Sequence, residues 1–432
     1  MIRRFRFTEF QLLILPSAMT VVGLLTIYLA STQDLDWDWR DIWISLAFMV
    51  GVFAMSLWFS VSNFRGDQVL FPLTVALSGL GLLLIQRLAP VLEERGAEYA
   101  SLPENQLIYL AAGLTLLLGV VTCVRRIGWL RRYKYTWALA GILLMIVTMI
   151  FGVEINGARL WLDIGPFTIQ SSEIAKLALV VFLAGYLAEN QELIVSTYRV
   201  GPLRLPPIPY VMPLVLMWAF SLLIVVAQND LGTALLFFGI FLSMLYMASG
   251  KISYVVAGLA TFAIGFYFAY ISFDRVQLRV TNWLNPWDDP LVGGYQPVQS
   301  EYALASGKFL GTGLAQGQPG YIPEVHSDFV FAAIGEELGL LGSFVVLLLF
   351  MLLVFRGYYI ALRARDAFGR YLAAGLTTIL AVQSLIIIGG TVRLIPLTGI
   401  TLPFISAGGS SLLTNFIVIG LLLRISDPRL AG

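Results

Sequence analysis

The sequence predicts an all-α polytopic membrane protein with about twelve transmembrane helices, and three observations lead to this prediction. The 432-residue chain is 58% hydrophobic and only 12% charged, with a mean hydropathy of +0.84, so it cannot supply the charged surface of a soluble protein. Apolar runs near 20 residues recur along the whole chain, and each can cross a hydrocarbon core of about 30 Å. These runs are too long and too continuously apolar for barrel strands, which leaves helices to satisfy the backbone.

The apolar runs set the order and the limits of the predicted spans. The first run follows the basic segment "RRFRF" and extends to about Ala30 without a small-residue cleavage site, so we interpret it as an uncleaved span rather than a signal peptide. The twelve predicted spans lie near 10–31, 42–61, 69–89, 105–124, 135–153, 172–188, 211–228, 231–249, 252–272, 328–355, 371–391 and 406–424.

Charge indicates how these spans are oriented. Most Lys and Arg residues fall in alternate loops that include "RRIGWLRRYK" at 125–134, which predicts that these loops and both termini are cytoplasmic. Most Asp and Glu residues then fall at the outer face, where we expect the polar chemistry. The longest stretch between spans is one extracytoplasmic loop at 273–327, rich in Gly, Pro and aromatic residues, and "VQSEYALASGKFL" within it predicts a short interfacial helix.

Composition and motifs exclude several classes of function. The single cysteine, Cys123, excludes an intramolecular disulfide, and the single histidine, His326, argues against a zinc cluster. The net charge of +1 gives no indication of a nucleic-acid partner. The chain has no P-loop, and "GTGLAQG" at 311–317 follows no predicted strand, so it is interpreted as loop glycine. We therefore expect neither nucleic acid nor an organic cofactor.

Two acidic features belong to spans 6 to 8. In "SSEIAK", Glu173 and Lys176 are three residues apart on one helix face and can form an ion pair, with Ser171 or Ser172 as a candidate helix cap. In "AQNDLGTA", Asp230 lies at the outer junction of spans 7 and 8. Each feature has a structural alternative, which is an interhelical ion pair for Glu173–Lys176 and helix capping for Asp230.

Three more acids belong to "HSDFVFAAIGEELG". Asp328 is expected at the outer start of span 10, as a functional acid or as the helix cap. Glu336 and Glu337 are expected about two turns deeper, where hydrogen bonding to neighbouring helices is the favoured interpretation. His326 is interpreted as a packing residue rather than a metal ligand. These acids predict an outer polar cavity, which suits a lipid-linked polar substrate or a transporter.

Five ordered blocks carry a resemblance to a known family. They are "NGARLWLDIGPFTIQSSEIAKLALVVFLA", "QNDLGTA", "DPLVGGYQPVQS", "PEVHSDFVFAAIGEELGLLG" and "PLTGITLPFISAGGSSL". In order and spacing they resemble the SEDS family of RodA and FtsW proteins over about residues 70–425. The resemblance implies a ten-span core at 66–432, with the first two spans, at 1–65, as an N-terminal addition.

The resemblance also implies a function and a partner. Family members are peptidoglycan glycosyltransferases that polymerise lipid II at the outer face of the bacterial cytoplasmic membrane, together with a class B penicillin-binding protein. Carried over by motif, the candidate catalytic residues are Asp328 and Asp230, and Glu173 and Lys176 match a third motif. A lipid II flippase or other transporter and a non-catalytic scaffold for a penicillin-binding protein remain as alternatives.

The reaction assigns roles to these residues. Asp328 is the expected base for the 4-hydroxyl of the acceptor GlcNAc, which gives inversion and a β-1,4 linkage. Positive charge must stabilise the departing pyrophosphate, and Mg²⁺ or Mn²⁺ is a candidate cofactor with Asp328 as its candidate ligand. The remaining candidates for substrate binding are Glu173, Lys176, Arg159, Arg279, Gln299, Lys308, His326, Arg393 and Ser410.

Some positions depart from the family pattern. Leu160 stands where the family commonly has Arg, Pro is usual at Ser171 and Asn229, and Tyr is usual at Ala407. The usual "GLLPVTG" is "RLIPLTG" here, which adds Arg393. Because the acids are kept, these departures favour retained activity with altered lipid contacts.

Overall fold

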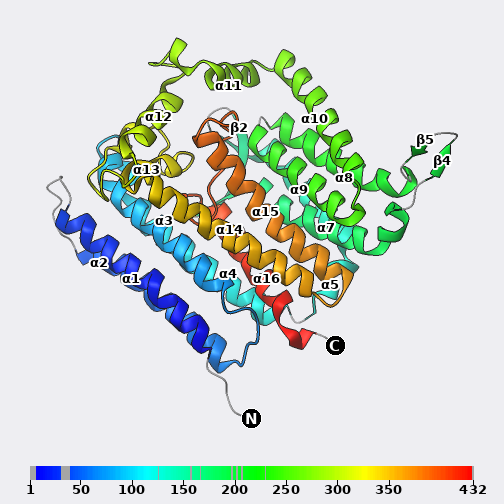
Figure 1. The fold of residues 1–432 in the computed structure, drawn as a ribbon, viewed down its shortest axis with the longest axis horizontal. Helices are drawn as coiled ribbons and strands as arrows, with labels where there is room; N and C mark the ends of the chain where they lie inside the picture. Colours follow the sequence, from blue (N-terminus) through cyan, green and yellow to red (C-terminus); the bar gives the residue numbers. More distant parts are fainter. Residues whose placement is uncertain are drawn as a thin grey trace. The chain divides into compact units, whose positions relative to one another are not determined.

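The structure is a computed structural model that describes residues 6–30, 39–124, 126–155, 158–165, 167–195, 198–200, 203–205, 208–228 and 230–430 (Figure 1). Within these residues, eleven helices are long and apolar enough to cross a membrane, which confirms the predicted class of fold. They are α1 (Phe7–Ala30), α2 (Trp39–Val61), α3 (Leu70–Glu93), α4 (Leu102–Cys123), α6 (Lys134–Phe151), α7 (Ser171–Val195), α9 (Leu231–Ser249), α10 (Ile252–Ser272), α14 (Gly339–Arg363), α15 (Ala367–Thr391) and α16 (Gly409–Ser426).

The remaining predicted span, 211–228, coincides with α8 (Ile208–Ala227), in which Pro209–Phe220 forms a shorter apolar stretch within the described residues. The other helical elements are short. They are η1 (Ala97–Ser101), α5 (Gly128–Arg132), α11 (Asp274–Leu284), η2 (Pro286–Asp288), α12 (Tyr295–Gly307), η3 (Pro319–Tyr321), α13 (Val330–Glu337) and η4 (Pro428–Leu430).

The chain divides into two compact units. The first contains Met1–Cys123, Leu278–Arg356 and Gln383–Arg429, and the second contains Val124–Gln277, Gly357–Val382 and Leu430–Gly432.

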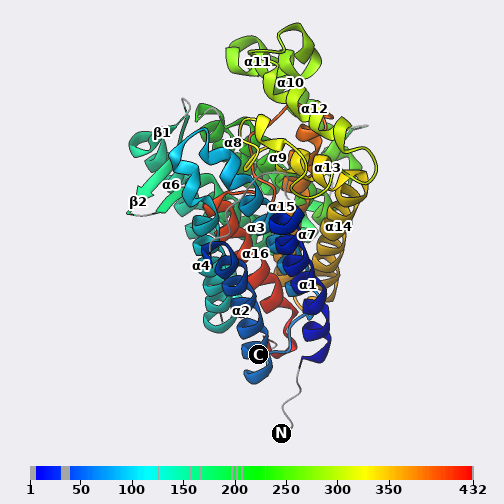
Figure 2. The ribbon, with the colours of Figure 1, turned by 90° about the vertical axis from the view of Figure 1, so that its left-hand side faces the viewer.

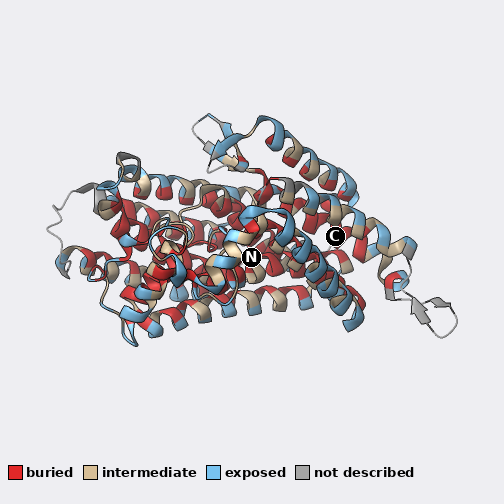
Figure 3. Cartoon of the chain, turned by 90° about the horizontal axis from the view of Figure 1, so that it is seen from above, coloured by how far each residue is buried: buried red, intermediate tan, exposed pale blue. Residues whose placement is uncertain are grey.

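In the first unit, α1 packs on α3, α2 packs on α4, and α4 runs beside α16 (Figure 2). Gly113 of α4 leaves room for the ring of Phe416 on α16, and this ring lies 5.7 Å from that of Phe404. Most residues of α3 are buried, so this helix forms the centre of the unit. Figure 3 shows that buried residues lie along the inward faces of the helices.

Arg6 is buried and connects the N-terminal segment to the residues that follow α2. Arg6 donates to the carbonyl oxygens of Phe64 at 3.0 Å and Gly66 at 2.9 Å, and it forms an ion pair with Glu9. The Arg6 and Glu9 side chains are only 3% and 0% exposed, so these contacts satisfy two charges that are removed from water.

The second unit combines helices with short strands that the sequence did not predict. Helix α7 packs against α6, α8 and α9, and α10 packs against α9. The strands β1 (Val153–Ile155), β2 (Ala158–Ile164) and β3 (Phe167–Gln170) form an antiparallel sheet in that order, and β4 (Tyr198–Val200) pairs with β5 (Leu203–Leu205). In β2 and β3, Ile164 pairs with Phe167 across a turn where Gly165 has φ +64°. A left-handed turn residue suits glycine, which has no Cβ.

The long predicted loop at 273–327 contains the helices α11 and α12. The helix predicted from "VQSEYALASGKFL" at 298–310 is found as α12, which begins and ends three residues earlier. Helix α11 was not predicted. Its sequence is mixed in polarity and short, so it lacks the long apolar run from which the other helices were recognised.

The predicted tenth span, 328–355, is wrong in its first part. The structure divides it into α13 and α14, which are separated at Leu338, and α14 begins at Gly339, whose φ is +67°. The N–H groups of Leu340 and Leu341 donate to the carbonyl oxygens of Lys308 and Phe309, both at 3.0 Å, instead of continuing the helix. Glu336 and Glu337 therefore end a separate short helix and do not lie two turns inside a membrane span.

Candidate active site

A cavity of about 190 Å³ in the first unit brings together three of the candidate residues, which are Asp328, Arg279 and Arg393. They come from the segment before α13, from α11 and from the segment after α15. The full lining is Arg279, Asn282, Trp283, Gly293, Gln296, Pro297, Asp328, Phe329, Gly390, Thr391, Arg393, Ile395, Leu397 and Gly399.

Asp328 is held by a turn and by the chain near residue 406. Its N–H donates to the carbonyl oxygen of Glu324 at 3.0 Å. Ser406 Oγ donates to the Ser327 carbonyl oxygen at 2.5 Å, and the N–H of Ala407 donates to that of His326 at 2.8 Å. The residue at the N-cap position of α13 is Phe329, so Asp328 lies one residue before this position.

Gly399 lies close to both Asp328 and Arg279. A Cβ placed on Gly399 would lie 3.6 Å from Asp328 Oδ2 and 3.9 Å from Arg279 Nη2, so these two groups flank the glycine. Arg279 Nη1 also donates to the carbonyl oxygen of Thr398 at 3.2 Å. Gly399 has φ +73°, in the region that favours glycine.

The second cation, Arg393, is held by residues of the 273–327 loop. It forms an ion pair with Glu301 of α12. Trp287 Nε1 donates to Glu301 Oε2 at 3.0 Å, and Trp283 Nε1 donates to the Arg393 carbonyl oxygen at 3.0 Å. The Arg393 side chain is 35% exposed, so it is oriented by protein contacts while it remains open to a ligand.

The other two motif acids belong to the second unit. Asp230 is the N-cap of α9, where its carboxylate accepts from the N–H of Thr233 at 3.0 Å and from Thr233 Oγ1 at 2.6 Å. Gln170 Nε2 donates to the same carboxylate at 3.4 Å. Glu173 and Lys176 form the predicted ion pair on α7, and the Lys176 side chain is 1% exposed. Both structural alternatives are therefore observed, because Asp230 caps α9 and Glu173 forms an ion pair with Lys176.

The predicted serine cap of α7 is not found. Within the described part of the chain, the hydroxyl groups of Ser171 and Ser172 are buried and have no hydrogen-bond partner. Asn229, another departure from the family pattern, lies outside the described residues.

We expect Asp230→Ala to lower the free energy of unfolding by about 1 kcal/mol, because alanine cannot accept the N–H at the start of α9. Asp230→Asn should be close to neutral, since asparagine is an equally good cap. Thermal unfolding in detergent measures both changes. If Asp230→Asn stayed stable and lost activity, the negative charge would have a role beyond capping.

Four further candidates lie elsewhere in the first unit. Gln299 and Lys308 belong to α12 and its end, and the Lys308 carbonyl oxygen accepts from Leu340. Ser410 is in the first turn of α16, where its carbonyl oxygen accepts from Thr414 Oγ1 at 3.0 Å. Among the described residues that line the cavity, these three and His326 do not appear.

His326 packs against an aromatic ring. Its ring centroid lies 5.5 Å from that of Tyr99, with the two planes at 70°. Burial lowers the pKa of the imidazole from its ordinary value, although the carboxylate of Glu324 acts in the opposite direction. His326 is thus neutral at pH 7, so it offers no cation to a phosphate group.

Arg159 of β2 pairs with Glu154 of β1 at 3.2 Å, and both side chains are about half exposed. This surface ion pair belongs to the sheet of the second unit. An exposed pair of this kind contributes little to stability, so Arg159 can exchange its partner easily.

Sequence reasoning missed several polar residues of the cavity. Gln296 and Gly399 lie inside quoted family blocks, so the motifs could have identified them. Asn282 and Trp283 follow Arg279 by three and four residues on α11, and this spacing places all three on one helix face. They could be found only once α11 was known to be a helix.

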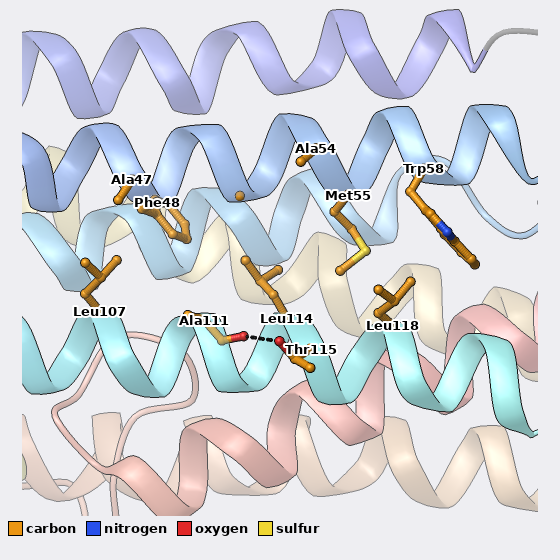
Figure 4. A pocket seen from close by; sticks show the side chains of 11 residues that line it. Ala47, Phe48, Ala54, Met55, Trp58, Leu107, Ala111, Leu114, Thr115 and Leu118 are labelled. Atoms are coloured by element: carbon orange, nitrogen blue, oxygen red, sulfur yellow. Dashed lines mark hydrogen bonds between the residues drawn. The ribbon is translucent and has the colours of Figure 1, made fainter.

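A further cavity of about 430 Å³ lies between α2 and α4 (Figure 4). Within the described residues, its lining contains no ionisable side chain, so it cannot supply an acid or a base. The lining is Ala47, Phe48, Gly51, Ala54, Met55, Trp58, Leu107, Ala111, Leu114, Thr115 and Leu118.

Comparison with known families agrees with the sequence motifs. The family model described as "Cell cycle protein", which covers FtsW, RodA and SpoVE, matches residues 68–429. The chain belongs to the SEDS family. Helices α1 and α2 precede the matched region of this SEDS protein.

Its relatives include both branches of the family. The chain is 38% identical to "Peptidoglycan glycosyltransferase RodA" of Mycobacterium tuberculosis (strain ATCC 25618 / H37Rv), over 98% of this chain and 90% of that protein. It is 34% identical to "Probable peptidoglycan glycosyltransferase FtsW" of Geobacter metallireducens, over 85% of this chain and 96% of that protein. The mycobacterial alignment covers nearly the whole chain, so it extends beyond the family match into the residues before 68.

Solved structures share the fold. A chain from a peptidoglycan synthase complex that coordinates polymerization and crosslinking superposes with a TM-score of 0.70 and 27% identity, over 85% of this chain and 99% of that chain. The rod shape determining protein RodA of Thermus thermophilus gives a TM-score of 0.59 and 26% identity, over 84% of this chain and 97% of that chain.

Proposed function

We propose that this SEDS protein is a peptidoglycan glycosyltransferase that polymerises lipid II at the outer face of the bacterial cytoplasmic membrane. Its relatives carry the names of peptidoglycan glycosyltransferases. The observation that supports this function best is the cavity that holds one carboxylate, Asp328, together with the guanidinium groups of Arg279 and Arg393. Acid–base chemistry and stabilisation of an anionic leaving group need this combination.

Asp328 is the general base of the proposed reaction. Its carboxylate accepts the proton of the 4-hydroxyl of the acceptor GlcNAc as that oxygen attacks C1 of the donor sugar. The bond between C1 and the pyrophosphate oxygen breaks with inversion, which forms a β-1,4 linkage. Undecaprenyl pyrophosphate leaves with the bonding electron pair.

The arginines stabilise the charge that develops on this leaving group. Guanidinium groups bind phosphate oxygens in a bidentate manner and stay charged at all relevant pH values. Lys176 is buried and already paired with Glu173, so Arg279 and Arg393 are stronger candidates for this role.

A divalent cation, Mg²⁺ or Mn²⁺, is part of the proposal, with Asp328 as its protein ligand. Mg²⁺ is commonly held by one or two carboxylates together with substrate phosphates, and Asp328, the one carboxylate among the described lining residues, fits such a site. The cation would add positive charge beside the pyrophosphate.

The proposed partner is a class B penicillin-binding protein, which would crosslink the strands that this protein makes. A structural relative comes from a peptidoglycan synthase complex in which polymerization and crosslinking are coordinated. The basic loops, "RRIGWLRRYK" above all, favour cytoplasmic termini for this multi-pass protein, with the polar cavity at the outer face.

Purified protein with lipid II tests the proposed function against its alternatives. A polymer ladder on a gel supports the glycosyltransferase. Movement of lipid II across a proteoliposome bilayer without polymer would instead support a flippase. A scaffold would show neither activity, and its function in cells would survive replacement of Asp328.

We expect the main effect of Gly399→Ala to be a higher KM for lipid II, accompanied by a smaller loss of thermal stability. The added methyl group would occupy the space beside Asp328 and Arg279 without an outright clash, as the distances of 3.6 and 3.9 Å show. The positive φ adds a stability cost of about 1–2 kcal/mol. Initial rates at varied lipid II concentration measure the change, and Gly165→Ala in the β2–β3 turn, also at positive φ, is the matched control for strain alone.

A further inference from the structure

The glycine-rich segment 311–318, defined by the sequence "GTGLAQGQ", surrounds the C-terminal end of α13. The N–H groups of Thr312 and Gly313 donate to the carbonyl oxygens of Glu336 at 2.9 Å and Glu337 at 3.0 Å. The N–H of Gln318 donates to Glu336 Oε1 at 2.8 Å. The first two bonds satisfy carbonyl groups that a helix end leaves open, and the third goes to the Glu336 side chain.

All three glycines of this segment are required by its shape. Gly311 has φ +86°, and a Cβ there would lie 2.2 Å from the carbonyl oxygen of Glu337. Gly313 has φ +105°, which disfavours any residue with a Cβ. A Cβ on Gly317 would lie 3.0 Å from Glu337 Cγ and 3.2 Å from the carboxyl carbon of Glu336. The segment is therefore shaped to the end of α13 and to its two glutamates.

Arg87 of α3 joins the same helix end to the centre of the unit. Its Nε donates to Glu337 Oε1 at 3.0 Å, and its Nη2 donates to the carbonyl oxygen of Gly317 at 2.9 Å. The side chains of Arg87 and Glu337 are 2% and 0% exposed. Burial raises the pKa of Glu337, and the charge of Arg87 acts against this rise.

The N-terminal addition supports the segment from its other side. Ala315, which is fully buried, packs in one cluster with Leu24 and Ile27 of α1 and with Leu83 of α3. Helix α1 therefore contacts the segment 311–318, which surrounds the end of α13. Helix α1 itself lies outside the region matched by the family model.

The opposite end of α13 leads directly to the candidate base. The helix has eight residues, all buried, and Phe329 and Asp328 immediately precede it. Phe329, Ala332 and Ala333 pack in one cluster with Leu88 and Leu92, which follow Arg87 on α3. A helix of this length is rigid and about 12 Å long, so a displacement of Glu337 along it is transmitted to Asp328.

We propose that Arg87 and Glu337 are positioning residues for Asp328, and that α1 supports them through the segment 311–318. This inference rests on the proposed function. The buried ion pair fixes where α13 lies along α3, and α13 in turn fixes Asp328 in the cavity. The N-terminal addition thereby gains a role in the reaction without contacting substrate.

Arg87→Gln is the principal test, with initial rates of lipid II polymerisation measured on folded, purified protein. We expect kcat to fall about 100-fold with KM little changed, since small displacements of a reacting group have effects of this size. Arg87→Lys keeps the charge but not the forked geometry, so it should recover part of the rate. Ile27→Ala should lower kcat less, and in the same direction.

Arg6→Gln is the matched control, because Arg6 also belongs to a buried ion pair of the first unit and donates to backbone carbonyls. It should lower the temperature of unfolding and leave kcat per folded molecule near the wild-type value. An unchanged kcat in Arg87→Gln would overturn the inference, and so would an equal loss of kcat in both variants.

Hydrogen exchange gives a second readout that does not depend on activity. Arg87→Gln should increase amide exchange in residues 326–333, which include the bonds from Asp328 to Glu324 and from Ala332 to Phe329, whereas Arg6→Gln should not. If wild-type protein made no polymer, the proposed function would fail, and exchange would still decide the positioning role. Unchanged exchange in Arg87→Gln would count against it.

Discussion

Asp328→Asn is expected to abolish lipid II polymerisation in a protein that still folds. Asparagine has nearly the same shape as aspartate but cannot accept the proton of the attacking hydroxyl group at neutral pH. General base catalysis typically contributes about 10²–10⁴-fold, and a loss in this range would reduce polymer below detection on a gel. The assay is the purified protein with lipid II, alone and with a class B penicillin-binding protein.

The controls separate lost chemistry from lost structure. Thermal unfolding of Asp328→Asn should stay close to that of wild type, because asparagine keeps the size of the side chain and the backbone bond to Glu324 remains. Asp328→Glu keeps a carboxylate at a longer reach and should retain partial activity. Polymerisation by Asp328→Asn at the wild-type rate would exclude Asp328 as the base.

The membrane helices could be predicted because bilayer thickness fixes the length of an apolar run. The span predicted at 231–249 coincides with α9, whose ends are marked by a capping Asp230 and by Gly250 at φ +64°. Both signals are local in sequence, so they are visible without the fold.

The division between α13 and α14 could not be predicted in this way. The immediate neighbours of Gly339, Leu338 and Leu340, are apolar, and a glycine between apolar residues is compatible with a continuous helix. The bonds that end α13 come from residues 312 and 313, and those that begin α14 go to residues 308 and 309. Such partners are distant in sequence, so only the tertiary structure reveals the break.

The candidate site, too, depends on contacts between residues that are distant in sequence. Asp328, Arg279 and Arg393 were identified singly, from a motif and from their expected position at the outer face. Their presence in one cavity depends on α11 and on the chain after α15, which no local pattern connects. Glu301, which forms the ion pair with Arg393, was missed because the sequence of a loop does not show which distant residue an acid contacts.

Arg279→Gln is expected to lower kcat about 10²-fold, because removal of one donor to a developing negative charge typically has this effect. Glutamine can still donate to the carbonyl oxygen of Thr398, so the local structure should be kept while the positive charge beside Asp328 is lost. Initial rates over a range of lipid II concentrations measure kcat and KM separately.

Three variants show whether the fall in kcat is due to the positive charge of Arg279. Arg279→Lys should recover part of kcat, since it keeps the charge without the bidentate geometry. Arg275→Gln, four residues earlier on α11 and absent from the described lining of the cavity, should leave kcat unchanged. Arg393→Gln should have a smaller effect than Arg279→Gln, because Glu301 already neutralises part of the Arg393 charge.

The two kinetic constants then decide what Arg279 does. A fall in kcat at constant KM places its contribution in the transition state, where the pyrophosphate departs. A rise in KM at constant kcat would contradict this assignment, because an interaction of equal strength in ground state and transition state only anchors the substrate. Arg279 would then hold the lipid-linked pyrophosphate before the reaction, and the charge of the departing group would have to be stabilised by other groups.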